Sequence, residues 1–148
     1  MPMIDVYAAV GTFGDPHALA QNLASELMAI EQVPDIPMFR KNTAAFVHEL
    51  PPSGISNVDG DSTYVRVQVL TNAGALDRAK QLAVVSRFSA IVGEAAGDPS
   101  LAERTWVLLT EALLEQGFSD NEIRKIMGEN VVRVLLNVLP PPPLIYEY

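Results

Sequence analysis

Met1-Pro2-Met3-Ile4-Asp5-Val6-Tyr7 opens the chain with a small, rigid residue, and an alternating pattern of β-forming residues follows at once. Residues 3–10 are therefore predicted to form a strand. An initiator methionine is usually removed when the second residue is small, and its removal would leave Pro2 as a secondary amine at the end of a buried strand. Such an amine is a candidate general base, and no other residue of the chain offers so definite a chemistry.

The residues that follow predict a helix and a second strand. Gly11 and Gly14 break the first strand, and Asp15-Pro16 supplies an N-cap acceptor followed by proline at the first helical position. Apolar residues at spacings of four, four and three mark one face of a helix over 16–31, namely Leu19, Leu23, Leu27 and Ile30. The prolines of 33–37 end this helix, and residues 43–50 are predicted to form the second strand.

The next part of the chain predicts a linker and then the same elements again. Residues 51–62 are nearly all turn formers, and 63–70 alternate strictly as a third strand. Asp77 starts a second predicted helix, and 104–110 is the fourth strand. The apolar face of the second helix is predicted to hold Leu82, Val85, Phe88 and Val92. Its end is marked by helix-breaking residues, Gly93, Gly97 and Pro99.

The order strand, glycine turn, helix, loop and strand thus occurs twice. Val6 corresponds to Val67, Asp15 to Asp77, and Phe46-Val47 to Trp106-Val107, at an offset of about sixty residues. Residues 1–111 are therefore predicted to be a tandem βαβ repeat of the α+β class. Two such units would lay two helices on one face of a four-stranded sheet and leave the other face to water or a partner subunit.

Composition excludes several classes of function. The 148 residues suffice for one domain, and a net charge of −8, from 10 basic and 18 acidic residues, argues against binding to nucleic acid or an anionic membrane. There is no cysteine, and the two histidines lack metal-binding spacing, so neither a metal nor a cofactor is expected. Because no signal peptide or membrane span is visible, a soluble, cytoplasmic protein is expected.

The chain changes character after Glu111. A capping box at Ser119-Asp120-Asn121-Glu122 supports a helical extension over 112–139, and the tail 140–148 begins with four prolines that favour polyproline II. Residues 113–135 resemble the C-terminal helices of membrane-dipeptidase-type zinc peptidases. They carry none of that family's metal ligands, so the likeness predicts no peptidase activity.

Residues 2–111 resemble the tautomerase superfamily, to which 4-oxalocrotonate tautomerase belongs. The likeness rests on Pro2 directly after Met1, the strand from Met3, the turn at Gly11, and the helix leading to strand 46–50. The second repeat matches again at Thr105–Glu111, and the length is that of the fused-repeat, trimeric members. This resemblance implies an amino-terminal proline that acts as general base or acid, arginines that bind the carboxylate of a 2-oxo acid, and a homotrimer.

Two arginines are candidates for binding that carboxylate. The family places arginine at the glycine turn and on the second strand, but by alignment these positions hold Thr12 and Ala44. The nearest substitutes are Arg40, just before the second strand, and Arg66, on the third. A surface or interface ion pair explains Arg66 equally well, and a solvated charge explains Arg40 equally well.

Two further side chains are candidates for the pocket. His48 lies on the predicted second strand, where it could orient water or hydrogen-bond a substrate, although a lone histidine on a half-buried strand is more often structural. Trp106 and its repeat equivalent Phe46 are first of all core aromatics, and either ring also suits the wall of an apolar pocket.

Two functions of different class therefore stand. In the first, the chain is a proline-based tautomerase in which Pro2 moves a proton between carbon and oxygen of a small anionic 2-oxo acid, with related hydration or decarboxylation left open. In the second, it is a non-catalytic oligomeric scaffold or binding protein with a replaced C-terminal end. The fate of Met1 separates them, because a proline acylated by Met1 has no basic nitrogen.

Overall fold

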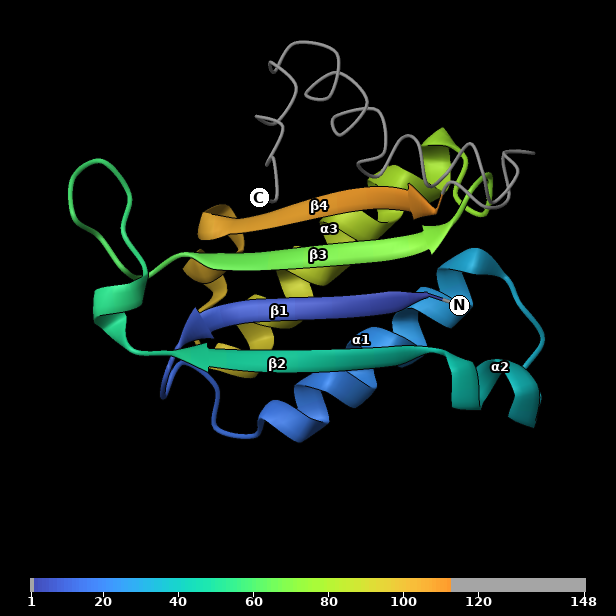
Figure 1. The fold of residues 1–148 in the computed structure, drawn as a ribbon, viewed down its shortest axis with the longest axis horizontal. Helices are drawn as coiled ribbons and strands as arrows, with labels where there is room; N and C mark the ends of the chain where they lie inside the picture. Colours follow the sequence, from blue (N-terminus) through green and yellow to red (C-terminus); the bar gives the residue numbers. More distant parts are fainter. Residues whose placement is uncertain (1, 113–148) are drawn as a thin grey trace, which may run out of the picture. The chain divides into compact units, whose positions relative to one another are not determined.

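The computed structural model describes residues 2–112, which form a four-stranded sheet with two long helices on one face (Figure 1). The strands lie in the order β2-β1-β3-β4, and their bounds are Met3–Ala9 for β1, Ala44–Leu50 for β2, Val65–Asn72 for β3 and Thr105–Ala112 for β4. The helices are α1, Pro16–Glu31, behind β1 and β2, and α3, Arg78–Ala96, behind β3 and β4. This architecture confirms the predicted tandem βαβ fold.

The sheet register shows the repeat directly. β1 pairs with β2 in parallel and β3 with β4 in parallel, while β1 and β3 run antiparallel at the centre. Val6 lies opposite Val67, its own counterpart in the second repeat, so the two halves are related by a local two-fold axis between these valines. Each position in the first repeat therefore has an equivalent position in the second repeat, at the opposite end of the sheet.

The core lies between the sheet and the two helices. Alternation places every second residue of β1 and β3 on the buried face: Ile4, Val6, Ala8, Val65, Val67 and Val69. α1 adds Leu19, Leu23 and Leu27, which are buried as its sequence predicted. At about 25 cal/mol per Å² of apolar surface removed from water, this shared layer is the main stabilising contribution to the fold.

Local sequence sets the ends of α1. The Asp15 carboxylate accepts the Ala18 N–H at 2.9 Å, and Pro16 needs no donor at the first helical position. At the other end Gln32 takes the left-handed conformation, with φ 62°, and its N–H returns to the Ala29 carbonyl. The predicted bounds of 16–31 are confirmed.

The predicted face of α3 was half wrong. Phe88 and Val92 are buried, but Leu82 is 54% exposed and Val85 is 40% exposed. The stripe against the sheet passes instead through Val84 and Ile91. Apolar residues occur around more than one side of this helix, so periodicity alone admitted two stripes, and contact with the sheet selected one.

The predicted end of α3 also needs correction. The helix starts after the Asp77 cap, as expected, but it continues through Gly93 to Ala96 and ends at Gly97, whose φ is 65°. Gly93 serves packing: a Cβ built there would lie 3.2 Å from the Asp98 carbonyl oxygen and 3.3 Å from Pro99 Cα. The missing side chain lets the following segment cross close to the helix.

We expect Gly93→Ala to destabilise the protein by about 1–3 kcal/mol, the usual cost of overpacking. Alanine is the better helix former by about 1 kcal/mol, so an uncrowded site would show the opposite sign. Urea unfolding of the variant and wild type measures the difference. A variant that is more stable than wild type would show that the segment after α3 moves away from the added methyl group at little cost.

Three short helical turns replace expected loops. They are α2, Pro37–Asn42, η1, Pro52–Gly54, and η2, Pro99–Arg104. Each begins with a proline, which fits the first position of a helix. Pro37 and Pro99 were interpreted only as ends of the preceding helix, and Pro52 as part of the linker. β3 is shifted two residues along from its prediction, and β4 runs to Ala112. The predicted helical extension beyond Ala112 and the tail 140–148 lie outside the described residues.

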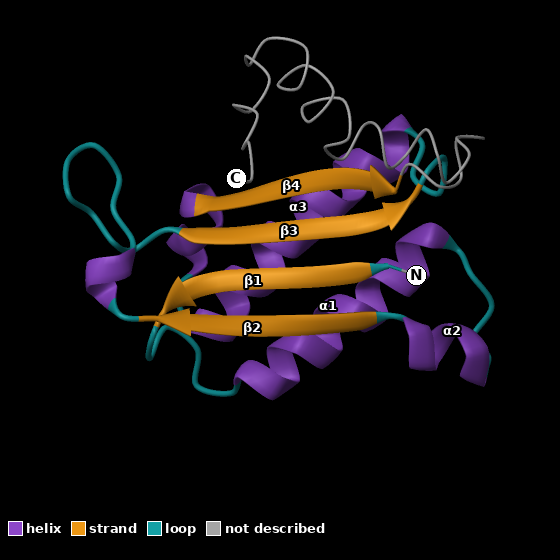
Figure 2. Cartoon of the chain, in the orientation of Figure 1, coloured by secondary structure: helices purple, strands orange, loops and turns teal. Residues whose placement is uncertain are grey.

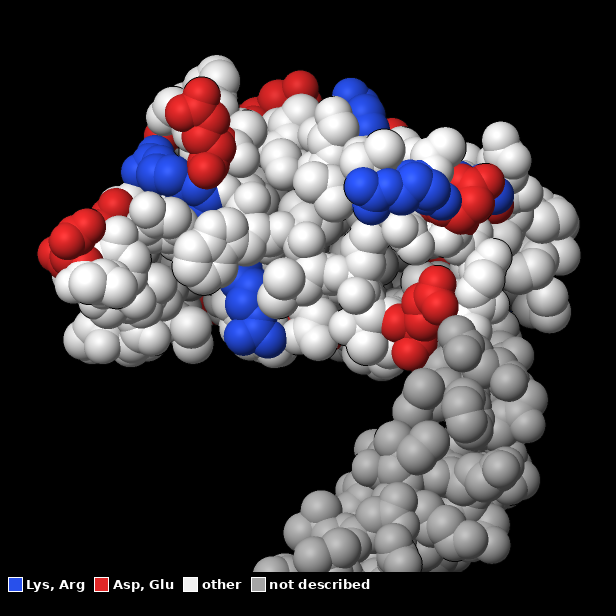
Figure 3. Space-filling model, turned by 90° about the horizontal axis from the view of Figure 1, so that it is seen from above, with Lys and Arg blue, Asp and Glu red and all other residues white. Residues whose placement is uncertain are grey.

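The sheet face opposite the helices, seen in front in Figure 2, carries exposed apolar side chains. They are Met3, Phe46, Leu70, Trp106 and Leu108. Charged side chains on the face drawn in Figure 3 are scattered among neutral atoms, and some basic groups lie directly beside acidic ones. Within residues 2–112, no helix is long and apolar enough to cross a membrane.

Candidate active site

Pro2 immediately precedes β1, one of the two central strands, at the end of the sheet marked N in Figure 1. Its side chain is half-buried, and its carbonyl accepts the Ala44 N–H at 3.4 Å, which ties it to the start of β2. The strand pairing that begins at Met3 continues along both sides of β1. Pro2 is therefore attached to a rigid element, as a positioned base requires.

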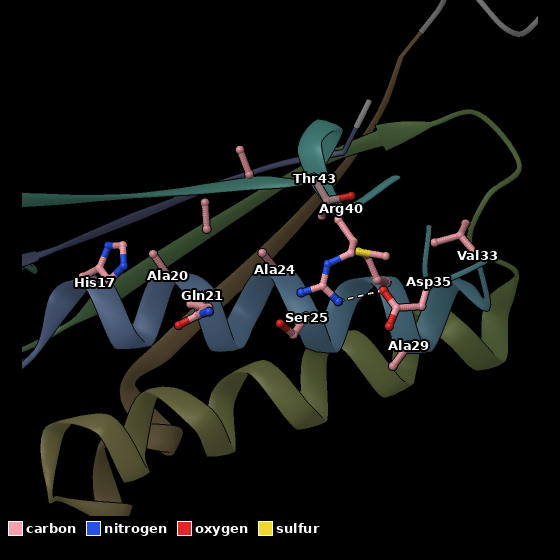
Figure 4. A pocket seen from close by; sticks show the side chains of 13 residues that line it. His17, Ala20, Gln21, Ala24, Ser25, Ala29, Val33, Asp35, Arg40 and Thr43 are labelled. Carbon is pink, nitrogen blue, oxygen red and sulfur yellow. Dashed lines mark hydrogen bonds and ion pairs between the residues drawn. The ribbon is translucent and has the colours of Figure 1, made fainter. Parts of the chain in front are cut away.

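A hollow of about 540 Å³ lies among α1, α2 and the start of β2, at the same end of β2 as the contact with Pro2. Small side chains of α1 keep it open, including Ala20, Ala24, Ser25 and Ala29. Figure 4 shows His17 at one end of this row and the Arg40–Asp35 pair at the other. Its floor is formed by Thr43, Ala44 and Ala45. The lining combines small apolar side chains with polar ones and includes the Arg40–Asp35 ion pair.

Arg40 is the predicted carboxylate ligand that the structure places at this end. Its Nη1 donates to Asp35 Oδ1 at 2.8 Å, and this hydrogen bond, with the attraction between the charges, raises the pKa of Arg40. The guanidinium has five N–H donors, and this contact uses one of its nitrogens. Arg40 therefore keeps donors that a substrate carboxylate can accept.

The other three predicted residues are brought together at the opposite end of the sheet. In the strand register His48 and Arg66 lie on either side of Tyr7, and Trp106 lies beside Arg66. Tyr7 is five residues beyond Pro2, a distance of about 16 Å at the usual rise of a strand. Within one subunit, His48, Arg66 and Trp106 thus form a group apart from Pro2.

The sequence interpretation missed Tyr7, which is the centre of this group. Its ring stacks on the His48 imidazole, with centroids 4.5 Å apart and planes at 11°. Arg66 Cζ lies 5.1 Å from the Tyr7 ring centroid, and because β2 and β3 flank β1, it occupies the other face of the ring. Asp5 Oδ1 lies 2.6 Å from His48 Nε2 and orients that imidazole. Only the register of β1 against both neighbours could have revealed the stack.

A second hollow, of about 250 Å³, lies beside this stack. Its lining includes Tyr7, Tyr64, Arg66 and Trp106, together with loop residues 54–57. The rings of Tyr64 and Trp106 are 5.4 Å apart and tilted by 49°, a favourable aromatic arrangement. Tyr64 was also missed, because its strand was predicted without reference to the loop that faces it.

Arg104 fixes the backbone just before this hollow. It donates to Thr63 Oγ1 at 2.6 Å and to Asp98 Oδ2 at 3.0 Å, joining the start of β3 to η2. The pKa of Asp98 is lowered chiefly by the Ser100 hydroxyl, with Arg104 adding to the effect, and that of Asp61 chiefly by the Thr63 N–H. Both carboxylates are ionised and accept hydrogen bonds from the turns that follow them. These bonds hold the backbone that leads into Tyr64 in place.

Comparison with known proteins identifies the fold. No family model and no curated protein matches the sequence. Among solved structures, a fused 4-OT described as a wild-type asymmetric trimer matches with a TM-score of 0.62 and 19% identity, over 84% of this chain and 98% of that chain.

Two other matches have different described activities. A member of the cis-3-chloroacrylic acid dehalogenase family matches with a TM-score of 0.59 and 14% identity, over 92% of this chain and 99% of that chain. A malonate semialdehyde decarboxylase inhibited by 3-bromopropiolate matches with a TM-score of 0.55 and 16% identity, over 87% and 96%. The peptidase-like segment 113–135 lies outside the described residues, and that resemblance stays a prediction. The described part of the chain has the fold of these 4-OT, dehalogenase-family and decarboxylase structures, with Pro2 just before a central strand.

Proposed function

We propose that the chain, once Met1 is removed, is a tautomerase that uses the Pro2 amine as general base on a small anionic 2-oxo acid. The observation that carries this proposal is the place of Pro2, half-buried at the start of β1 in this fold. The structures that share the fold are described as 4-OT, dehalogenase-family and decarboxylase proteins. Related hydration or decarboxylation remains an alternative chemistry of the same amine.

The chemistry follows from the amine. An α-amino group titrates near ~7.7–8.0, and partial burial disfavours its charged form, so a neutral fraction is available at neutral pH. In ketonisation the nitrogen accepts the proton of the enol hydroxyl, and the ammonium then delivers a proton to the neighbouring carbon. The O–H bond is replaced by a C–H bond, the double bond moves to oxygen, and Pro2 returns to its initial state.

Arg40 is the proposed ligand of the substrate carboxylate because it lies at the end of β2 that contacts Pro2. We expect Arg40→Gln to raise KM for phenylpyruvate about tenfold while changing kcat less, since a carboxylate is bound equally in the ground and transition states. Lys41→Gln, an exposed neighbour, is the matched control. Equal KM values in wild type and Arg40→Gln would leave Arg40 as the ion-pair partner of Asp35 only.

A homotrimer, acting in the cytoplasm, completes the proposal. The apolar open face of the sheet supports assembly, and two fused 4-OT structures of this fold are described as trimers. His48, Arg66 and Trp106 of one subunit would contact the same substrate as a Pro2 amine only if that Pro2 belonged to a neighbouring subunit of the trimer.

The non-catalytic scaffold is the second candidate, favoured by the absence of arginine at both expected positions. The mass of the purified full chain and a phenylpyruvate ketonisation assay decide between the two. Loss of Met1 together with ketonisation above the buffer rate supports the enzyme. An intact Met1, or no activity in a chain that begins at Pro2, supports the scaffold.

A further inference from the structure

Glu31, the last residue of α1, carries a carboxylate that is buried on the helix side of the sheet. The residue is 9% exposed, and its Oε1 accepts the hydroxyl of the buried Thr71 at 2.6 Å. Within residues 2–112, no lysine, arginine or histidine forms an ion pair with this carboxylate. Burying a carboxylate is costly unless a cation pairs with it, and one hydroxyl offsets only part of that cost. A cationic partner for Glu31 is therefore expected.

The pairing of β1 with β3 brings Pro2 to the residue that holds this carboxylate. β1 begins, and β3 and α1 end, at the same end of the sheet (Figure 1). Met3 pairs with Leu70, so the next pair along the two strands is Pro2 and Thr71. Residues opposite each other on antiparallel strands have Cβ atoms about 4.5–5.5 Å apart. By alternation from Ile4 and Val69, both side chains also belong to the face that packs against the helices.

The second repeat lacks both the carboxylate and the proline. At the offset between the two helix caps, Glu31 corresponds to Gly93. At the offset that relates the central valines, Pro2 corresponds to Thr63. The βαβ unit therefore does not need a carboxylate at the end of its helix. That the two groups occur together, at one end of the sheet only, indicates that the carboxylate serves Pro2.

The other charged side chains around this end of the sheet make different contacts. Lys80 Nζ donates to the backbone carbonyl of Glu31 at 3.0 Å, and Arg40 pairs with Asp35. Glu111 lies beside Thr71 in the register, but on β4, which is one strand further from β1. Three more charged groups of neighbouring segments are exposed, namely Lys41, Asp77 and Arg78. Glu31 is thus the carboxylate bonded to the residue opposite Pro2.

We propose that Glu31, held by Thr71, is the counterion of the Pro2 ammonium once Met1 is removed. Thr71 fixes one carboxylate oxygen, and the second accepts the N–H of the protonated pyrrolidine. The inference rests on the free amine of the proposed function, in which it makes Glu31 a positioning residue. A neighbouring carboxylate favours the charged amine and so offsets the effect of burial. The pair would hold the ring in one direction while the nitrogen carries the substrate proton.

Nitrogen NMR of isotope-labelled proline, on the full chain beginning at Pro2, measures the pKa of this amine without a substrate. We expect Glu31→Gln to lower the pKa of Pro2 by about 1 unit or more, because an opposite charge within ~4–6 Å stabilises the ammonium. Glutamine keeps an acceptor for the Thr71 hydroxyl and removes only the charge. The rising limb of kcat/KM against pH should move to lower pH by the same amount, since the neutral base then forms at lower pH.

Thr71 supplies a second pair of variants, which decides the matter if Glu31→Gln does not fold. Thr71→Val removes the hydroxyl that orients the carboxylate and should lower the pKa of Pro2 by about half a unit, less than loss of the charge itself. Thr71→Ser keeps the hydroxyl and should retain the wild-type value. Glu26→Gln is the matched control on α1, because Glu26 pairs with Arg87 of α3. Glu111→Gln tests the other carboxylate, about 10 Å from β1 across two strand spacings, and should change the pKa little.

Several results would overturn the inference. They are an intact Met1 in the purified protein, an unchanged pKa of Pro2 in Glu31→Gln, an equal change in Glu26→Gln or Glu111→Gln, and equal values in Thr71→Val and Thr71→Ser. Ketonisation of phenylpyruvate is measured on the same chains. The expected change in pKa without ketonisation would retain the ion pair and reject the tautomerase. Ketonisation with an unchanged pKa would reject the ion pair alone.

Discussion

Replacing Pro2 by alanine is expected to lower kcat/KM for phenylpyruvate ketonisation by about 100-fold, within the range ascribed to a positioned general base. Both chains would begin with an amine after loss of Met1, so the variant tests the pyrrolidine ring itself. The ring fixes the direction of the nitrogen lone pair at the start of β1, whereas the primary amine of alanine rotates and is more strongly hydrated when charged. Initial rates at fixed pH, with the mass of each chain, give the comparison.

Pro51→Ala provides the control for this substitution. Pro51 is exposed and follows β2 at the opposite end of the sheet, and the Gly54 N–H that bonds its carbonyl does not depend on the ring. It should retain the wild-type rate. Equal rates in Pro2→Ala and wild type would show that the reaction does not need the pyrrolidine ring of Pro2.

Phe88→Ala should destabilise the protein by about 3–5 kcal/mol, the range for removing a buried phenylalanine. Phe88 is 0% exposed, in the middle of α3, and packs in the layer between the helices and the sheet. The cavity left behind cannot collapse easily, because strands of the sheet support it from below. Urea unfolding at one fixed protein concentration measures the change and avoids shifts from assembly.

Leu82→Ala is the matched substitution on the same helix. Leu82 is 54% exposed, so its truncation should cost less than about 1 kcal/mol. Both residues belonged to the apolar face that periodicity predicted, so the pair also tests which stripe of α3 is buried. Similar losses for the two variants would indicate that α3 presents Leu82 to a packed surface.

The fold was largely predictable because its strongest signals are local. The alternation of β1 and β3, the caps at Asp15 and Asp77, and the spacing of apolar residues on α1 each arise within a few residues. The repeat then predicted the topology, because each βαβ unit pairs its two strands in parallel and the two units join in one four-stranded sheet. The short turn α2 was missed because its proline serves equally as the end of one element and the start of another.

The candidate site was predictable only residue by residue. Pro2 follows from its position before the first strand, and Arg40 from its place before the second. The grouping of His48 and Arg66 around Tyr7 was not visible, because it depends on two strand registers at once. Three of the candidate residues, His48, Arg66 and Trp106, lie together in the structure, but about 16 Å along the strands from Pro2, and their role stays a prediction.

The sequence by itself determined the secondary elements, the tandem repeat and the identity of the one candidate base. These depend on backbone preferences and periodicity, which act over a turn of helix or a few residues of strand. The tertiary structure alone decided which stripe of α3 is buried, that Gly93 packs rather than terminates, and that Arg66 stands against Tyr7 without a carboxylate. The contact of Arg66 with Tyr7 joins the two repeats and exists only once the strands have paired in register. The packing at Gly93 depends on how closely the segment after α3 crosses the helix, which backbone preferences do not specify.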